Sequence, residues 1–269
     1  MGLDKAAARK VVRVAIGCPS YKGPHKDTFD SYHELMHYFG RLQERSYLPP
    51  EHRRGLPPLD RMEALPLAEL RDDEPVFEFV MVTRTGNSLI GQARDSIVEA
   101  ALATKCDYLF FYDDDMIFGR DAFLRLWRHQ KPFVGALAFT AREPIAPVLY
   151  KFHRTWNFDR QRDDCEIQVI FDYPKDTLFQ VDGIGAGVVL IDMACFRAVP
   201  QPWFHGAVSA GEDIHFCWSL YRNSIPVYCD TSVKTLHVPN VPVRWHDEAY
   251  FLESRDKSEA WYRSQRGAA

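Results

Sequence analysis

The sequence lacks the patterns that mark membrane-spanning and secreted proteins. It contains no run of about 18 apolar residues, so no transmembrane helix is predicted. The opening segment MGLDKAAARK has no apolar core after its charges, and we expect no secretory signal. None of the six cysteines forms a C-x-x-C pair, and several lie in apolar runs, where a free thiol behaves as a small hydrophobe. These absences predict reduced thiols and a cytoplasmic protein.

A large charge of either sign is also missing. The net charge of −4 and the isoelectric point near 6.2 exclude a strong general attraction to nucleic acid or anionic membranes, although local basic patches remain open. The chain has 269 residues, of which 46% are hydrophobic, an ordinary composition for a globular protein. This length allows one large α/β domain or two small ones.

Apolar runs typical of strands alternate with segments of helical periodicity along most of the chain. Strands are predicted near 11–18, 76–83, 109–112, 133–139, 148–152, 166–171, 188–191 and 225–229, and helices near 28–39, 88–101, 118–130, 192–199 and 212–222. This alternation predicts a single α/β domain over residues 1–269 with a mixed sheet. A proline-rich insertion over 46–75 and a charged C-terminal tail over 240–269 depart from the pattern.

Three consecutive carboxylates follow the most apolar strand. Leu109 to Tyr112 are apolar or aromatic, which indicates a buried strand, and Asp113, Asp114 and Asp115 come directly after it. Three acids in a row repel one another unless a cation lies between them, and ligands of open α/β sheets bind at the carboxyl ends of strands. We predict a site for Mg²⁺ or Mn²⁺, which prefer oxygen ligands. The alternative is a solvated acidic turn in which Asp115 begins the next helix.

Four further features could carry chemistry, and each has a purely structural explanation. Glu212 and Asp213 open a helix, where acids also stabilise the helix dipole. His237 lies in an extended segment, and a lone histidine there can be structural. Asp182 precedes the run Gly183-Ile184-Gly185-Ala186-Gly187, which lacks the Gly-Lys-Ser/Thr ending of a phosphate loop. We expect close backbone approach to a ligand at this run, or else a plain loop.

The order of these features resembles the metal-dependent glycosyltransferases with the GT-A fold, especially the broad family-two-like group. The resemblance covers residues 11–25 and 76–238 and depends on an apolar strand ending in an Asp-x-Asp motif, a helix led by Glu-Asp, and a late histidine, His237. It implies a single GT-A-type domain with a Rossmann-like mixed sheet flanked by helices. The resemblance does not extend to residues 40–75 or to the tail after 240.

The resemblance also implies roles for individual residues. Asp115 would bind the metal directly, and His237 would be a third protein contact to the same ion. Asp113 would contact the ion through water or the nucleotide ribose. The remaining nucleotide or sugar contacts would come from residues along the chain, namely Pro19, Ser20, Tyr21, Arg94, Asp114, Asp182 and Gly185.

Such enzymes move a sugar from a UDP- or GDP-sugar to an acceptor hydroxyl. A divalent cation stabilises the charge that gathers on the departing diphosphate. Asp213 is our candidate for the base that takes the proton of the acceptor, with Glu212 as its substitute. Trp203 and Phe204 are candidates for stacking on a sugar face, with burial in the core as the equal alternative.

Other functions on the same scaffold are a nucleotidyltransferase, a non-catalytic nucleotide-sugar-binding module and a metal-dependent nuclease. A nucleotidyltransferase usually carries a glycine-rich loop with basic residues after the first strand, which the segment from Gly17 to Lys22 does not supply. The acceptor is left open between a glycan, a protein, a small metabolite and a modified base in DNA. The sequence determines neither the oligomeric state nor whether the sugar is transferred with inversion or retention of its anomeric configuration.

Overall fold

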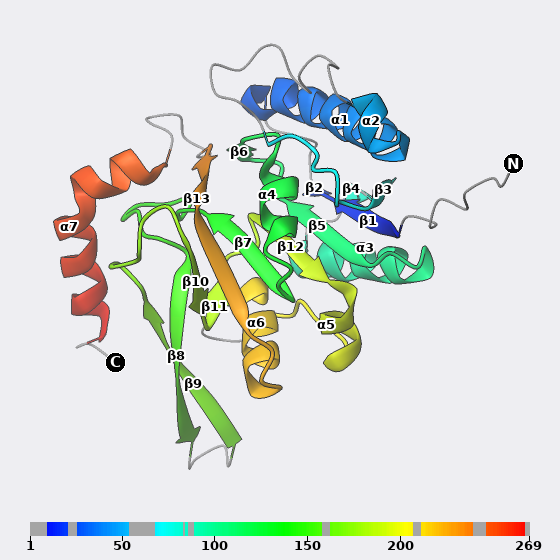
Figure 1. Ribbon diagram of the computed structural model, residues 1–269. Coiled ribbons are helices and arrows are strands. Elements are labelled where there is room, and N and C mark those ends of the chain that lie inside the picture. The colour runs from blue at the N-terminus through cyan, green and yellow to red at the C-terminus, as the bar shows by residue number, and fades with distance from the viewer. Residues whose placement is uncertain are drawn as a thin grey trace, which may run out of the picture.

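The computed structural model describes residues 10–20, 26–53, 68–82, 84–85, 89–157, 162–206, 211–238 and 246–266 (Figure 1). Tyr21, one of the predicted nucleotide contacts, lies outside the described residues, as does the centre of the proline-rich segment. The prediction of an α/β domain with a Rossmann-like mixed sheet flanked by helices is confirmed. None of the helices in the described ranges is both long and apolar enough to cross a membrane.

A central sheet forms the middle of the molecule. Its strands are β1 (Val11–Gly17), β3 (Val76–Met81), β5 (Tyr108–Tyr112), β7 (Phe133–Leu137), β10 (Leu178–Val181), β12 (Val188–Asp192) and β13 (Val227–His237). The spatial order is β10-β13-β7-β12-β5-β1-β3, and β6 (Met116–Phe118) pairs with the end of β13. Strands β3, β1 and β5 are parallel, β12 is antiparallel to both β5 and β7, and β13 is parallel to β7. The carboxyl ends of β1, β3, β5, β7 and β13 therefore meet at one edge, together with the amino end of β12.

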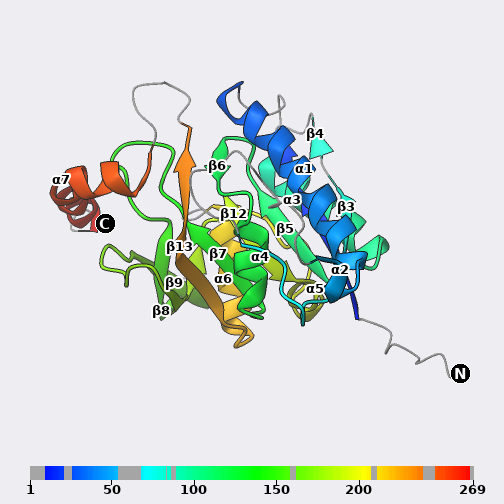
Figure 2. The same ribbon diagram turned by 45° about the horizontal axis from the view of Figure 1, so that its top comes forward.

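Helices cover both faces of the sheet, because successive residues of each buried strand point to opposite sides. Helices α1 (Lys26–Tyr47) and α4 (Ala122–Arg128) pack on one face, against Phe110 and Tyr112. Helices α3 (Ile90–Ala103), α5 (Met193–Ala198) and α6 (Glu212–Arg222) pack on the other, against Leu109 and Phe111. Figure 2 turns the α1 face toward the viewer. The near-continuous apolar sequence of β5 follows from this burial on two sides.

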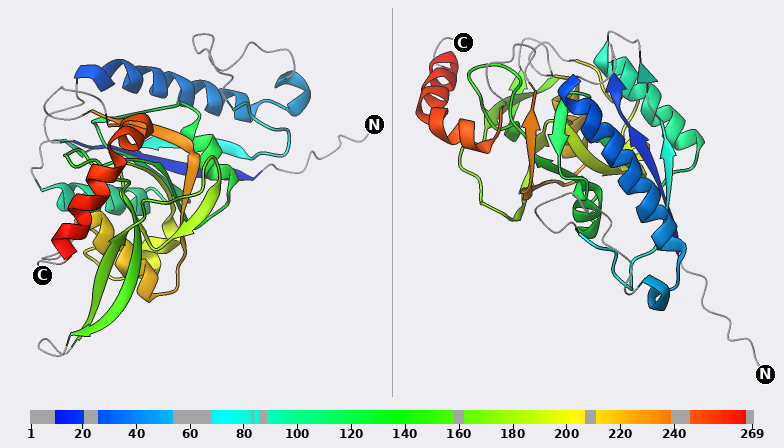
Figure 3. Two further views of the ribbon diagram at one scale, coloured as in Figure 1. Left: turned by 90° about the vertical axis from the view of Figure 1, so that its left-hand side faces the viewer. Right: turned by 90° about the horizontal axis from the view of Figure 1, so that it is seen from above.

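A second, smaller sheet extends from the main body. Strands β8 (Leu149–Asn157) and β9 (Arg162–Val169) form a long hairpin, and β11 (Gly183–Ile184) pairs with the start of β8. The left panel of Figure 3 shows this hairpin extending beyond the central sheet. The strands predicted at 148–152 and 166–171 belong to it, although the sequence pattern did not predict its length.

Some predicted boundaries differ from the structure. Helix α6 begins at Glu212 and ends at Arg222 as predicted, whereas the strand and the extended segment predicted over 225–238 are the single strand β13. The helix predicted over 118–130 is the shorter α4, because β6 occupies its first residue. The tail forms α7 (Glu248–Arg266), a helix at the β10–β13 side of the sheet. The remaining elements are the short helix α2 (Pro50–Arg53) and the paired segments β2 (Pro19–Ser20) and β4 (Arg84–Thr85).

Candidate functional site

A cleft lies at the edge where the carboxyl ends of the parallel strands meet. Its volume is about 470 Å³, and its lining includes Asp113 after β5, His237 at the end of β13 and Asp213 in the first turn of α6. The loop after β7, the glycine run before β12 and two aromatic residues of α7 complete the lining. Groups separated by more than a hundred residues in sequence therefore share one concave site, which is where α/β sheets bind ligands.

Asp115 and His237 are in direct contact at this edge. Oδ2 of Asp115 lies 3.1 Å from Nε2 of His237. The backbone fixes this proximity, because the Val238 amide donates to the Asp115 carbonyl at 2.9 Å and β6 pairs with the end of β13. The predicted meeting of the acidic strand end with the late histidine is thus present in the structure.

The hydrogen bond of the other ring nitrogen of His237 determines whether Nε2 faces Asp115 with a proton or with a lone pair. Nδ1 donates a hydrogen bond to the Phe139 carbonyl at 2.8 Å, so a neutral ring presents the lone pair of Nε2 to the Asp115 carboxylate. Two acceptors attract each other only when a cation, either a proton or a metal ion, lies between them. Burial lowers the pKa of His237, but the hydrogen bond and charge of Asp115 raise it by more, and the net shift is upward.

This pair fits a divalent cation. Two adjacent ligands of an octahedral ion with bonds of about 2.0–2.1 Å lie roughly 2.9 Å apart, close to the observed separation. A ring whose Nδ1–H is held by a backbone carbonyl is the usual arrangement of a metal-binding histidine. Within the described ranges, no three His, Cys, Asp or Glu side chains form a ready-made metal group. Mg²⁺-type ions commonly bind one or two carboxylates and take their other ligands from water and substrate phosphates.

Arg94 holds two of the predicted site carboxylates. Its Nη2 donates to Asp113 Oδ1 and Oδ2 at 2.7 and 3.0 Å, and its Nε donates to Glu212 Oε1 at 3.3 Å. A third nitrogen, Nη1, donates to the Ala186 carbonyl at 3.4 Å, and the side chain is only 3% exposed. Arg94 was predicted to reach the nucleotide or sugar; in the structure its guanidinium is occupied inside the protein and links β5, α6 and the glycine run.

The same network explains the positions of Asp113 and Glu212. Burial raises the pKa of Asp113 to about 6, with the positive charge of Arg94 acting in the opposite direction. The Asp113 carboxylate is directed to Arg94 and also lies near the charges of Asp115 and His237, so its contact with a metal ion through water stays a prediction. Glu212 likewise faces Arg94 and, unlike Asp113, is absent from the lining of the cleft.

Asp213 also lines the cleft. Its Oδ2 accepts from the Ala186 amide at 3.2 Å and its Oδ1 accepts from the Ile214 amide at 2.7 Å. Burial, followed by the nearby charge of Glu212, raises the pKa of Asp213 above its ordinary value. Gly185 lies beside it, as the close-approach prediction requires: a Cβ at Gly185 would lie 2.8 Å from the Val148 side chain and 3.6 Å from Asp213 Oδ2.

Three predicted contacts lie away from the cleft. Asp182 accepts from the Phe152 amide at 3.0 Å and lines a separate depression bordered by β8, β10 and the end of α6. Trp203 and Phe204 are 4% and 2% exposed and pack against Phe196 in the core. The suggestion that these two aromatic rings stack on a sugar is therefore wrong, and the core alternative is correct.

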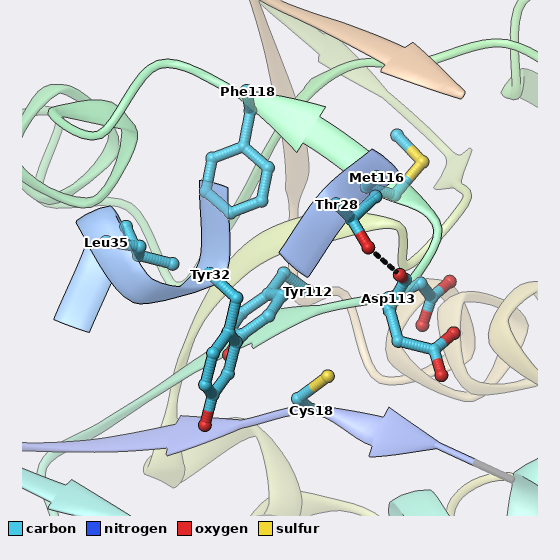
Figure 4. Close-up of a pocket in the computed structure, with 9 residues that line it drawn as sticks. Cys18, Thr28, Tyr32, Leu35, Tyr112, Asp113, Met116 and Phe118 are labelled. Carbon is cyan, nitrogen blue, oxygen red and sulfur yellow. Dashed lines mark hydrogen bonds between the residues drawn. The ribbon is translucent and has the colours of Figure 1, made fainter. Parts of the chain in front are cut away.

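The residues after β1 support the acidic strand end from the α1 side. The Ser20 hydroxyl donates to the Asp114 carboxylate, Pro19 is buried, and Thr28 of α1 donates to the Asp114 carbonyl at 2.6 Å. Asp114 also borders a narrow apolar cavity between α1 and β5 that is shown in Figure 4. Its lining residues include Cys18, Tyr32, Leu35, Tyr112 and Phe118. The cavity has a volume of about 20 Å³, enough for a water molecule but not for a nucleobase.

Sequence reasoning missed the groups that the β7–β8 loop and α7 bring to the cleft. Arg142 supplies an exposed guanidinium, and Trp261 and Tyr262 supply aromatic rings. Helix α7 is held in place by Phe251, which is fully buried against Phe139, and by Glu248, whose Oε1 pairs with Lys175 at 2.6 Å. Nothing in the spacing of the tail indicated this docking, because it depends on one buried aromatic residue and on ion pairs with distant segments.

Comparison with known proteins gives distant structural likenesses alone. No family model matches the chain, and no curated protein matches its sequence. The solved structures that resemble it include A197 from STIV, with 15% identity, coverage of 84% of this chain and 85% of that chain, and a TM-score of 0.46. UDP-glucose pyrophosphorylase complexed with UDP-glucose has 7% identity, coverage of 95% and 100%, and a TM-score of 0.42. Mannose-1-phosphate geranyltransferase from Thermus thermophilus has 13% identity, coverage of 84% and 75%, and a TM-score of 0.34. At these low scores we base no functional conclusion on the likenesses.

Proposed function

We propose that this protein is a metal-dependent transferase that moves a sugar from a UDP- or GDP-sugar to an acceptor hydroxyl. The observation that carries the proposal is the convergence of three groups on one cleft: Asp113, Asp213 and His237, with Asp115 in contact with the histidine. The carboxylate and imidazole of Asp115 and His237 suit a cation and a diphosphate. The buried carboxylate of Asp213 suits proton transfer.

Asp115 and His237 are the residues that would hold Mn²⁺ or Mg²⁺ on the donor side. The ion would act as a Lewis acid toward the diphosphate leaving group. Arg142 lines the same cleft and is exposed, so its guanidinium can reach phosphate oxygens that the ion does not neutralise. Arg94 does not take this role, because its charge is already shared between Asp113 and Glu212.

Asp213 is the proposed base on the acceptor side. Its raised pKa makes it a stronger base than an exposed aspartate, and its amide hydrogen bonds fix the carboxylate against the glycine run. In the transfer, the acceptor oxygen bonds to the anomeric carbon, the bond from that carbon to the diphosphate breaks, and the hydroxyl proton passes to Asp213. Glu212 would support this step through Arg94 rather than by touching the substrate.

Nucleotidyl transfer, the alternative that the sequence left open on the same scaffold, is the reaction to exclude. The nucleophile in that reaction is the phosphate of a sugar phosphate, which is already ionised at neutral pH and needs no base. A buried aspartate with a raised pKa at the cleft therefore favours a hydroxyl nucleophile.

The two reactions give different products from the same protein. We would incubate the full chain with Mn²⁺ and a panel of UDP- and GDP-sugars and measure release of nucleoside diphosphate. In parallel we would incubate it with nucleoside triphosphates and sugar 1-phosphates and measure pyrophosphate. Metal-dependent release of UDP or GDP that is lost in Asp213→Asn supports glycosyl transfer.

Pyrophosphate release that persists in Asp213→Asn would replace the proposal with nucleotidyl transfer. Metal-dependent nucleotide binding without turnover of any donor would indicate that the protein is a non-catalytic nucleotide-sugar-binding module. Asp182→Asn is the matched control, because Asp182 is an aspartate of the same region that does not line the cleft. Its turnover should equal that of the wild type.

A further inference from the structure

A second, larger groove continues from the cleft between the β8–β9 hairpin and α7. Its volume is about 1320 Å³, and Tyr262 of α7 lines both hollows. Gly211 and Ile214 line the groove while Asp213 lines the cleft, so the first turn of α6 stands at the junction. The left panel of Figure 3 shows α7 running beside the hairpin. A ligand lying in the groove would thus present its end to Asp213.

We propose that this groove binds an extended, uncharged carbohydrate chain as the acceptor, an inference that rests on the proposed function. Pockets for drug-sized ligands occupy roughly 300–1,000 Å³, so a groove of this size suits an elongated ligand rather than a small metabolite. Because the groove and the cleft share Tyr262, one end of such a ligand would lie close to the proposed reacting centre.

The chemistry of the walls suits sugar rings. Trp261 is 46% exposed at the cleft, and Tyr262 packs against it with a ring-centroid distance of 4.9 Å. Phe171 supports Tyr262 from behind at 5.6 Å. Flat, supported rings of this kind can stack on the C–H face of a sugar. Carboxylate and amide side chains that can pair with hydroxyl groups also line the groove, namely Glu166, Gln168, Gln180, Gln265 and Glu259.

The charges around the groove argue against DNA. Lys151 lies 3.8 Å from Asp182, and Arg263 pairs with Glu259 at 2.8 Å. Binding to a polyanion depends on cations that neutralise phosphates, and these two cations already have carboxylate partners. Glu166 and Asp172 add further negative charge to the lining. A modified base in DNA, one of the acceptors that the sequence left open, would have to overcome this repulsion.

Helix α7 forms one wall of the groove. Arg255 pairs with Asp172 at 2.5 Å and with Glu259 at 2.6 Å, and Phe251 is fully buried. These contacts hold the helix before any ligand arrives, so little ordering cost remains for binding. The tail, which the sequence left without a role, is therefore assigned to the acceptor site.

The test measures oligosaccharide binding to the full chain without nucleotide or metal. Neutral gluco-, xylo-, manno- and chito-oligosaccharides, from disaccharide to hexasaccharide, are titrated by calorimetry and by tryptophan fluorescence. We expect one series to bind more tightly as it lengthens. Trp261→Ala and Tyr262→Ala should each weaken that binding by up to about tenfold. Leu252→Ala is the control on the same helix, because Leu252 is 50% exposed and lines neither hollow.

Absence of length-dependent binding in every series would overturn the inference, as would equal affinities in the three variants. Tight binding of a DNA oligonucleotide that weakens steeply with salt would overturn it in favour of nucleic acid. Because the titrations contain no donor, they separate the two proposals. Oligosaccharide binding without donor turnover would retain the groove and reject the transferase, and donor turnover without oligosaccharide binding would do the reverse.

Discussion

Replacing Arg94 by methionine tests whether one buried cation organises the site. The substitution keeps an unbranched chain of similar length and removes the guanidinium. It leaves Asp113 and Glu212 without their common partner, with Asp213 close to both. We expect a loss of stability together with a loss of activity, since the carboxylates would repel one another and move apart.

The size of the stability loss follows from the burial of the network. Removing one partner of a buried ion pair costs roughly 3–5 kcal/mol. The side chains of Asp113 and Glu212 keep 26% and 19% of their surface exposed, so water recovers part of that cost and about 3 kcal/mol is expected. With an unfolding entropy of about 2.1 cal/mol/K per residue, this converts to a fall in Tm of about 5 °C for 269 residues.

Thermal unfolding followed by circular dichroism measures this shift. Arg94→Lys should fall between wild type and Arg94→Met, because an ammonium group keeps the charge but cannot form the same fork. Adding Glu212→Gln to Arg94→Met should restore part of the lost stability, because it removes one unpaired carboxylate. Arg13→Met is the control: the Arg13–Glu78 pair is 43% and 30% exposed and should contribute at most about 1 kcal/mol. An Arg94→Met protein that melts within about 1 °C of the wild type would refute the reasoning.

Three other outcomes follow from the contacts of single side chains. His237→Ala and Asp115→Ala should each abolish the Mn²⁺-dependent rise in Tm caused by UDP or GDP, because a ligand stabilises only a folded protein that binds it. An unchanged rise in both variants would show that these residues do not bind the metal ion. Asp213→Asn should stop transfer. The folded pKa of Asp213 is above its unfolded value, so ionisation opposes folding as the pH rises. The wild type should therefore lose more stability than the variant between acid and neutral pH, and equal losses would contradict this sign. Burial raises the pKa of Asp230, but hydrogen bonds, first that of His129 at 2.7 Å, lower it by more. Its stabilisation is therefore present above the unfolded pKa of about 3.9 and is lost as the pH falls through the lower folded value, and His129→Ala should flatten that loss in acid melts.

The meeting of Asp115 with His237 across 122 residues was implied by the glycosyltransferase resemblance, and strand direction explains why it occurs. Both residues follow or end apolar strands, β5 and β13, that point the same way in the sheet. An apolar run ending in acids and a second run ending in histidine are visible in the sequence. Parallel strands then bring their carboxyl ends to one edge, whatever lies between them in the chain.

The sequence contains an indication of the role of Arg94, namely its helical spacing, which neither the composition nor the order of the motifs reveals. Arg94 precedes Ile97, Val98 and Ala101 at spacings of three, four and seven residues, which puts it on the buried stripe of α3. An arginine on such a stripe must find carboxylates inside the protein, because an unpaired buried charge is too costly. The sequence could therefore indicate an internal ion pair, although it could not say which acids supply it.

The hairpin and α7 were harder to anticipate for a physical reason. Helix α7 is rich in charged residues, and its position depends on the burial of Phe251 against Phe139 and on the partners of Glu248. Most of these contacts join the helix to segments far away in the chain, and local periodicity carries no information about them. The strands of the β8–β9 hairpin pair mainly with each other outside the central sheet, so their alternation is weak.

Close backbone approach joins these separate parts into one site. A Cβ at Gly91 would lie 2.2 Å from the Phe204 carbonyl oxygen and 3.5 Å from the Cβ of Glu212, so α3 can approach the start of α6 only with glycine at this position. Gly91 lies one helical turn before Arg94 and thereby brings the guanidinium within reach of Glu212 while it still contacts Asp113. The spacing between α3 and the start of α6 is thus set by close packing at Gly91, and the ion pairs of Arg94 with Asp113 and Glu212 hold this packing in place.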